Sequence, residues 1–263
     1  MLESNDLEKK FFLENGYLIK KNILSQNLSF RKISKKFKGE LDELFKSKNI
    51  KNLGGYKSGN LNIYPGKFGI DILSILNDYS FKNYFNFLTN DNIENYKIIF
   101  GGNLNLPNSK YQFFHTDGTW NPRMIVINIA TSDIDLNNGP LELIEKSHLT
   151  NTNYHNFFLK NLLEKKKKIK LKFGEILIRE HRLWHRGTKN KSKKIREMLG
   201  IIFIKNENCS QKQKMEKSEN NKIYLHSNIF GITNKEKIKE FIFINFKFIF
   251  FFYKLIISIV KNK

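Results

Sequence analysis

The chain has 263 residues, of which 46 are Lys or Arg and 25 are Asp or Glu, which gives a formal net charge of +21. This length fits one domain with a buried core, and it excludes a peptide hormone or a collagen-like rod. An apolar share of 40% also argues against wholesale disorder, because such a chain can bury enough surface to offset the entropy lost on folding.

The positive charge is carried almost entirely by lysine. Only six of the 46 basic residues are arginines: Arg31, Arg123, Arg179, Arg182, Arg186 and Arg196. A skew toward Lys, Asn, Ile and Phe is what A/T-rich codons produce, and we attribute most of the charge to that bias. Selection for an anionic partner is the alternative. No nucleic-acid recognition motif accompanies the charge, so we expect no nucleic-acid partner.

The compartment is predicted from the cysteine content and the first residues. Cys209 is the single cysteine, which excludes an intramolecular disulfide and a cysteine-based zinc site and fits a reducing compartment. The first ten residues are acidic and amphipathic, without the basic and apolar regions of a secretory signal. We therefore expect a cytoplasmic protein.

The first third of the chain is predicted to be mainly helical. Residues 5–50 have helical spacing, interrupted by a break at Glu14-Asn15-Gly16 and a short strand at 17–20. Residues 54–69 contain several glycines and Pro65 and predict a loop-rich connection, after which 70–87 again has helical spacing.

From about Tyr96 onward the pattern changes to short apolar runs separated by Gly, Asn and Pro. The runs are 97–100, 124–130, 141–144, 169–178 and 199–204. Many short strands at this spacing are typical of an antiparallel sandwich or barrel. The polar stretch 205–222 predicts a mobile loop.

A histidine and a carboxylate lie two residues apart, at His115 and Asp117. Side chains at i and i+2 point to the same face of a strand, so this pair converges on one point. With a second imidazole it would form a two-His, one-carboxylate set for Fe(II) with open positions. His185, which follows a strand-like run and precedes a glycine, is our choice, and His181 is its competitor. A hydrogen-bonded pair without metal is the alternative reading.

The order of the surrounding motifs resembles the phytanoyl-CoA dioxygenase family of Fe(II)- and 2-oxoglutarate-dependent oxygenases. The matching stretches lie between residue 11 and about residue 204. They are Phe12-Leu-Glu-Asn-Gly-Tyr-Leu-Ile, Gln112-Phe-Phe-His-Thr-Asp-Gly, Asn137-Asn-Gly-Pro-Leu-Glu-Leu-Ile-Glu-Lys-Ser-His148, and Gly174-Glu-Ile-Leu-Ile followed by His185-Arg-Gly and Arg196.

This resemblance implies a fold, a ligand set and a cosubstrate. The fold is mainly β with flanking helices, built on a double-stranded β-helix (jelly roll, cupin-like) core. His115, Asp117 and His185 would be the catalytic iron ligands, and Arg196 would pair with the distal carboxylate of 2-oxoglutarate, since a guanidinium binds a carboxylate bidentately. The alternative for Arg196 is a surface charge. Fe(II), 2-oxoglutarate and O2 follow as cofactors, and Asp117 favours hydroxylation over halogenation.

Other residues near these motifs have structural readings. Asn138-Gly139-Pro140 predicts a tight turn, and His148 is interpreted as structural. Gly187 stands where other members of the family carry Ser, which leaves the second anchor of the cosubstrate undefined. Three aromatic residues flank the expected iron site and line either a pocket or the core: Tyr111, Trp120 and Trp184.

The C-terminal segment 241–260 is apolar and interrupted by two lysines, long enough to cross a bilayer. Glu240, Lys247, Lys254 and Lys261 recur every seven residues and would form one polar stripe on a helix. A helix lying in the headgroup plane of an anionic membrane fits this pattern best. A tail anchor that spans the bilayer and a helix packed on the barrel or on a second subunit are the alternatives.

We therefore predict an enzymatic domain at 1–232 and an amphipathic or membrane-associating helix at 233–263. The predicted activity is hydroxylation of an unactivated C–H bond in a small-molecule or lipid-linked substrate, with release of succinate and CO2, at the inner face of a membrane. The alternative is a non-catalytic basic β-barrel that serves as a binding module at a membrane surface. Neither the substrate nor the oligomeric state is predicted.

Overall fold

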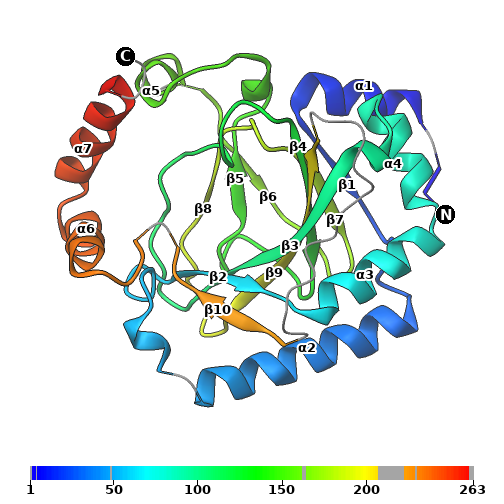
Figure 1. Ribbon diagram of the computed structural model, residues 1–263, viewed down its shortest axis with the longest axis horizontal. Coiled ribbons are helices and arrows are strands. Elements are labelled where there is room, and N and C mark those ends of the chain that lie inside the picture. Colours follow the sequence, from blue (N-terminus) through cyan, green and yellow to red (C-terminus); the bar gives the residue numbers. More distant parts are fainter. Residues whose placement is uncertain are drawn as a thin grey trace.

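The computed structural model describes residues 2–3, 5–47, 49–161, 164–206, 222–228 and 230–260. Two antiparallel sheets form its centre (Figure 1). The larger has the strand order β1-β7-β4-β9-β3-β2-β10 and the smaller the order β6-β5-β8. The strands are β1 (Tyr17–Lys20), β2 (Asn60–Tyr64), β3 (Tyr96–Asn105), β4 (Met124–Ala130), β5 (Leu141–Leu143), β6 (Lys167–Ile169), β7 (Ile176–Glu180), β8 (His185–Gly187), β9 (Arg196–Lys205) and β10 (Tyr224–His226).

Helices flank the sheets, which confirms the expected mainly-β architecture. They are α1 (Asp6–Asn15), α2 (Leu28–Ser47), α3 (Lys67–Asp78), α4 (Phe81–Thr89), α5 (Tyr154–Asn161), α6 (Asn234–Asn245) and α7 (Lys247–Val260). The buried positions of α2 recur every three to four residues, so this helix buries one stripe. Phe37 of that stripe packs with Phe68 of α3, and both belong to the same core cluster as Ile201 of the large sheet.

The alternation of side chains along β9 separates the core from a pocket. Leu199, Ile201 and Phe203 point into the core shared with the helices, whereas the residues between them line a cavity on the other face of the sheet. Successive side chains of a strand point to opposite faces, so one strand serves both. The helices thus seal one face of the large sheet and leave the other for the site.

Three predicted segments differ from the structure. The predicted loop 54–69 contains β2, whose asparagines disfavour a strand locally, but β2 pairs with β3 and β10 on its two sides. The predicted helix 70–87 is two helices that meet near Ser80, which has φ +61°. The predicted strand 169–178 is β6 and β7 in different sheets, separated at Gly174 (φ +78°), where a side chain would collide with the backbone of Ser25.

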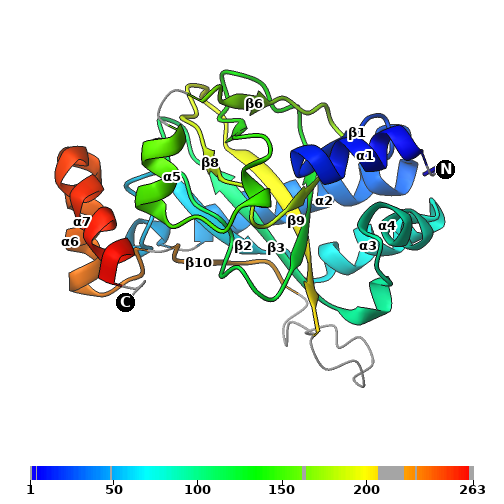
Figure 2. The ribbon, with the colours of Figure 1, turned by 90° about the horizontal axis from the view of Figure 1, so that it is seen from above.

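The C-terminal segment forms two helices instead of the expected single helix. The chain leaves helical geometry at Phe246 (φ −133°, ψ 61°), between α6 and α7. The single polar stripe is therefore wrong, and Glu240 is buried, where it accepts a hydrogen bond from the backbone N–H of Ser58 (2.9 Å). Both helices lie at the edge of the molecule opposite α1 and α4 (Figure 2). Within the described ranges, no helix is both long and apolar enough to span a membrane.

The predicted mobile loop 205–222 falls mostly outside the described residues, since 207–221 are not described, and Cys209 lies among them.

Candidate metal and cosubstrate site

Two imidazoles are held side by side by their own backbones. His115 and His185 form an isolated antiparallel bridge in which each N–H donates to the carbonyl of the other, both at 3.0 Å. Directly paired residues project their side chains to the same side of a ladder. The two rings accordingly lie 4.5 Å apart between centroids.

Each ring is oriented by a hydrogen bond from its Nδ1 to the carbonyl two residues earlier. The Nδ1 of His115 donates to the carbonyl of Phe113, and the Nδ1 of His185 donates to the carbonyl of Leu183, each at 2.8 Å. A proton held on Nδ1 leaves the lone pair on Nε2, which is the form that binds a metal. Burial, assisted by the charge of Arg179, lowers the pKa of His185 to about 3, so this ring is neutral at ordinary pH.

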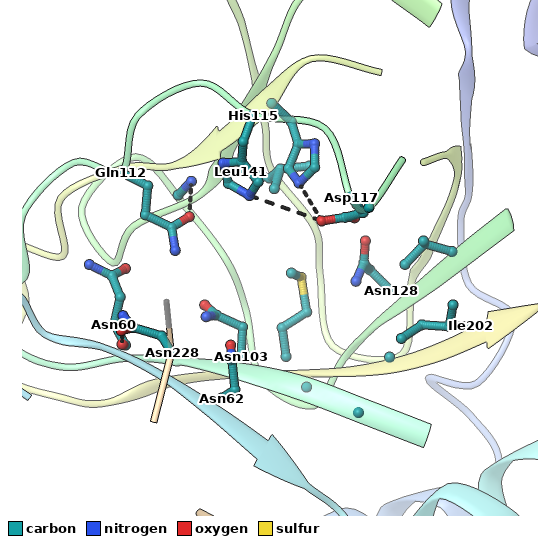
Figure 3. A pocket seen from close by; sticks show the side chains of 18 of the residues that line it. Asn60, Asn62, Asn103, Gln112, His115, Asp117, Asn128, Leu141, Ile202 and Asn228 are labelled. Atoms are coloured by element: carbon teal, nitrogen blue, oxygen red, sulfur yellow. Dashed lines mark hydrogen bonds and ion pairs between the residues drawn. The ribbon is translucent and has the colours of Figure 1, made fainter. Parts of the chain in front are cut away.

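Asp117 completes the group. Its backbone N–H donates to the carbonyl of His181 (3.0 Å), and its Oδ1 lies 3.5 Å from Nε2 of His185 and 4.0 Å from Nε2 of His115. One ligand atom from each of the three residues lies within 4.8 Å of the others, as Figure 3 shows for His115 and Asp117. The structure thus brings together the three residues predicted as ligands, and their chemistry fits a divalent iron with open positions.

A residue that the sequence analysis missed holds the carboxylate. Arg179 on β7 contacts Oδ2 of Asp117 through Nη2 (2.5 Å) and donates from Nε to the Asn128 side chain (3.0 Å). Burial opposes ionisation of Asp117, but Arg179 outweighs it and lowers the pKa of this carboxyl far below its usual range. Oδ1 stays free to face the imidazoles. Arg179 is one of six arginines in a lysine-rich chain, and nothing in the sequence distinguishes its role from that of the other five.

The competing histidines do not join this group. His181 is fully buried, donates from Nε2 to the carbonyl of Thr119 (2.9 Å) and accepts at Nδ1 from the N–H of Met124 (2.9 Å). His148 is buried beside Gly16 and donates from Nε2 to the carbonyl of Leu13 (3.1 Å), away from the site. His181 connects Thr119 to the start of β4, His148 connects its own segment to α1, and His185 is the better choice over His181.

Arg196 is a buried cation at the start of β9. Its side chain is 2% exposed, and its contacts are the carbonyls of Gly139 (3.2 Å) and Asn103 (3.5 Å). No carboxylate among the described residues pairs with it. Burial lowers its pKa to about 10, so the guanidinium stays charged at neutral pH. A buried charge without a partner is costly, and a carboxylate ligand fits this place. The alternative reading as a surface charge is wrong.

Gln112 occupies the place of the serine that this chain lacks. A Cβ added to Gly187 would lie 2.8 Å from Oε1 of Gln112, which accepts a hydrogen bond from the Gly187 N–H (2.7 Å). The Nε2 of Gln112 has no partner among the described residues, and Gln112 lines the same cavity as Arg196. The carboxamide is therefore a donor in the cavity that His115, Asp117 and His185 also line, and the sequence analysis overlooked it.

The three candidate ligands, Arg179, Arg196 and Gln112 line one cavity of about 690 Å³ between the two sheets. Its walls come from the segment 112–118 and from β2, β3, β4, β5, β7, β8, β9 and β10, and α6 and α7 contribute Phe243, Phe250 and Lys254. The three aromatic residues weighed as pocket residues are not part of the lining. Trp184 stacks on Phe157 at 3.8 Å in the core, Trp120 lies against Arg182, and Tyr111 lies against Arg186.

The sequence matches a family model described as phytanoyl-CoA dioxygenase over residues 73–198. The predicted resemblance is thereby confirmed, and with it the expected class of enzyme, a 2-oxoglutarate-dependent oxygenase. Among curated proteins, none matches the sequence.

Solved structures share the fold at low sequence identity. AviO1 from Streptomyces viridochromogenes Tue57 superposes with a TM-score of 0.60 at 13% identity, over 78% of this chain and 96% of its own. The epimerase SnoN in complex with Fe3+, alpha ketoglutarate and nogalamycin RO gives 0.59 at 11% identity, over 88% and 96%. EctD from S. alaskensis, with 2-oxoglutarate and 5-hydroxyectoine, gives 0.58 at 15% identity, over 76% of each chain. The expected jelly-roll core is confirmed by this likeness.

Proposed function

We propose, from the premise that residues 73–198 carry the phytanoyl-CoA dioxygenase match, that this protein is an Fe(II)- and 2-oxoglutarate-dependent hydroxylase of a small molecule. The observation that carries the proposal is that one ligand atom from each of the three residues lies within 4.8 Å of the others. In both imidazoles Nδ1 donates to a backbone carbonyl, which leaves Nε2 for the metal. The balanced reaction converts a substrate C–H, 2-oxoglutarate and O2 into C–OH, succinate and CO2.

We propose that His115, Asp117 and His185 hold the iron. When bound, the iron with its cosubstrate activates dioxygen for attack on an unreactive C–H bond. The protein's part is to hold the ligands in geometry: the paired backbones align the two rings, and Arg179 fixes the carboxylate by one oxygen. Ligating carboxylates and imidazoles oriented in this way bind metal more tightly than free ones.

We propose that Arg196 and Gln112 position 2-oxoglutarate. The guanidinium of Arg196 would pair with the distal carboxylate, and Nε2 of Gln112, whose Oε1 accepts from the Gly187 N–H, would supply the second anchor. Both groups line the cavity that contains the iron ligands. Since Oε1 of Gln112 is fixed by Gly187, its amide nitrogen is directed without loss of further side-chain freedom.

The test uses the full chain under anaerobic conditions. Fe(II) and 2-oxoglutarate should give a weak visible charge-transfer band, and exposure to air should yield succinate. The band should disappear in His185→Ala and Asp117→Ala and persist in the matched control Asp133→Ala, whose carboxylate is exposed and pairs with Lys172. An unchanged band in both ligand variants would show that the metal lies elsewhere.

We propose, second, that α6 and α7 rest on an anionic membrane surface, from which a lipid-linked substrate would reach the site. Phe248, Phe252 and Ile256 share one face of α7 and are 73%, 44% and 59% exposed. Exposed lysines stand nearby on these helices, at Lys235, Lys237 and Lys247. A large apolar face beside basic side chains suits the headgroup region of an anionic leaflet. In this proposal residues 233–263 are an attachment to the enzymatic domain 1–232.

Vesicle flotation tests this attachment. The protein should float with vesicles that contain phosphatidylglycerol and not with pure phosphatidylcholine vesicles, and Phe248→Ser/Ile256→Ser should abolish flotation. Leu7→Ser/Leu28→Ser is the matched control, because both leucines are exposed on other helices. If the α7 variant floats normally, or changes only the oligomeric state, the face serves another purpose.

A further inference from the structure

The pocket wall formed by β10, β2 and β3 carries a row of polar side chains. In the register of the sheet, His226 lies opposite Asn62, and Asn62 lies opposite Asn103. All three line the cavity, whereas Leu61, which precedes Asn62 on β2, is buried in the core and is not part of the lining. We call His226, Asn62 and Asn103 the polar row; Figure 3 shows its two asparagines around the space that His115 and Asp117 face.

Several hydrogen-bond donors and acceptors of the polar row have no partner among the described residues. The carboxamide of Asn62 has no hydrogen-bond partner among the described residues. Asn103 donates from Nδ2 to the carbonyl of Leu61 (3.2 Å) and keeps Oδ1 free, and His226 donates from Nδ1 to the carbonyl of Ser227 (2.9 Å) and keeps Nε2 free. Asparagine is frequent in this chain, but these side chains are partly buried and line a cavity, where an unpaired carboxamide is available to a ligand. A ligand with both donors and acceptors would satisfy it.

A further unpaired acceptor lies in the same strand. Asn60 is 1% exposed, and its Oδ1 is buried without a partner while its Nδ2 donates to the carbonyls of Ser58 and Lys110. It lies toward the cosubstrate end, 3.6 Å from where a Cβ on Gly187 would be. Orphaned buried polar atoms are rare in folded proteins, and one that lines a pocket points to a ligand.

The lining of the pocket offers few charged groups to a substrate. Among the described lining residues, Asp117 is the single carboxylate, and it faces the imidazoles and Arg179. Arg196 is assigned to the cosubstrate, and Lys254 lines the cavity from α7. No carboxylate remains to pair with an ammonium group, so the wall does not suit an amino acid or another cation.

Aromatic rings adjoin the polar row. Tyr64, two residues beyond Asn62 on the same strand face, stacks on Tyr224 with centroids 4.5 Å apart and lies 4.7 Å from the ring of His226. A pyranose ring has a rim of hydroxyl groups and faces made of C–H bonds. The rim matches carboxamides, which donate and accept, and the C–H faces match aromatic rings.

We propose that the substrate group bound in this pocket is a neutral polyhydroxylated ring of the pyranose class. Its hydroxyl groups bond to the polar row, its C–H face packs beside Tyr64, and a ring or exocyclic C–H is presented to the iron ligands. The proposal rests on the proposed hydroxylase function for the chemistry, but not for the binding.

Ligand-observed saturation-transfer NMR on the metal-free full chain tests the binding. The probes are the methyl pyranosides of glucose, galactose and mannose, with hexan-1-ol, choline and N-acetylglycinamide as the apolar, cationic and amide comparisons. At least one pyranoside should receive saturation, and the comparison compounds should not. Asn62→Leu keeps the size of the side chain and should weaken that pyranoside roughly 2- to 10-fold for each hydrogen bond lost. Asn52→Leu, at an exposed position of Ile50–Asn52, is the matched control and should bind as the parent protein does.

The same pyranoside should then raise succinate formation by the iron- and 2-oxoglutarate-loaded enzyme. Saturation transfer without succinate would remove the hydroxylase function and leave the binding class standing. If no pyranoside receives saturation, if a comparison compound binds in their place, or if Asn62→Leu binds the pyranoside as well as Asn52→Leu does, the pyranose class is overturned whatever the succinate assay shows.

Discussion

Replacing Arg196 with methionine separates ligand binding from stability. The guanidinium is buried, and within the described residues its partners are two carbonyls at 3.2 and 3.5 Å. A buried charge replaced by an apolar side chain of similar length is often neutral or stabilising. We therefore expect the melting temperature of the ligand-free Arg196→Met protein to be unchanged or higher.

The response to 2-oxoglutarate should nearly vanish in that variant. Two charge-assisted hydrogen bonds contribute together about 3 kcal/mol at the low end of their range, which corresponds to roughly 150-fold in affinity. A ligand at 100 times its dissociation constant stabilises the parent protein by about 2.7 kcal/mol, and the same concentration would stabilise the variant by about 0.3 kcal/mol. At about 2–4 °C per kcal/mol, the shifts are about 5–11 °C and about 1 °C.

The assay is a thermal-shift titration with 2-oxoglutarate in the presence of Mn(II), which stands in for iron without redox chemistry. Arg31→Met is the matched control, because Arg31 is exposed on α2 and bonds to Ser25 and Gln26. Its shift with 2-oxoglutarate should equal that of the parent. A parent-sized shift in Arg196→Met would refute the cosubstrate role, and a large loss of ligand-free stability would show that Arg196 is structural.

Three further predictions concern the cosubstrate anchor, the C-terminal helices and pH. Gln112→Ala removes the second anchor and should raise the KM for 2-oxoglutarate, and Gly187→Ser should raise it too because the new side chain displaces Gln112; an unchanged KM in Gln112→Ala, measured by succinate kinetics, would contradict the anchor role. Glu240→Ala removes the acceptor of the Ser58 N–H, so hydrogen exchange in 234–260 should accelerate; unchanged exchange would mean that other contacts hold these helices. Burial lowers the pKa of His148 below 6.5, so the contribution of its neutral ring to stability is present above that pH and is lost as pH falls. The melting temperature of His148→Gln should therefore fall less below pH 6.5 than that of the parent protein. If the two proteins lose melting temperature equally with falling pH, His148 does not cause the loss.

Local pattern and motif order were enough to predict much of the site. His115 and Asp117 were found because side chains two residues apart point to the same side of an extended chain. The strand β4 was predicted at its observed bounds because an uninterrupted apolar run identifies a buried strand without reference to distant residues. His185 was chosen because it follows a strand-like run and precedes a glycine, and the order of motifs in the family resemblance supported it and identified Arg196. Their placement beside His115 and inside the cavity depends on pairing between strands far apart in sequence.

Other features were decided by tertiary structure alone. Arg179 lies in an apolar run and contacts a carboxylate 62 positions away, so no local pattern marks its role. β2 has asparagines that disfavour a strand, yet pairing on both sides overrides that preference and aligns Asn62 with His226 and Asn103. The apolar C-terminal segment by itself fits either a membrane helix or a helix packed on the protein. Its hydrophobicity predicts that its apolar surface will be removed from water, but not whether lipid or protein will cover it. Only the fold shows that one face of α6 and α7 covers the pocket, which leaves the other face exposed.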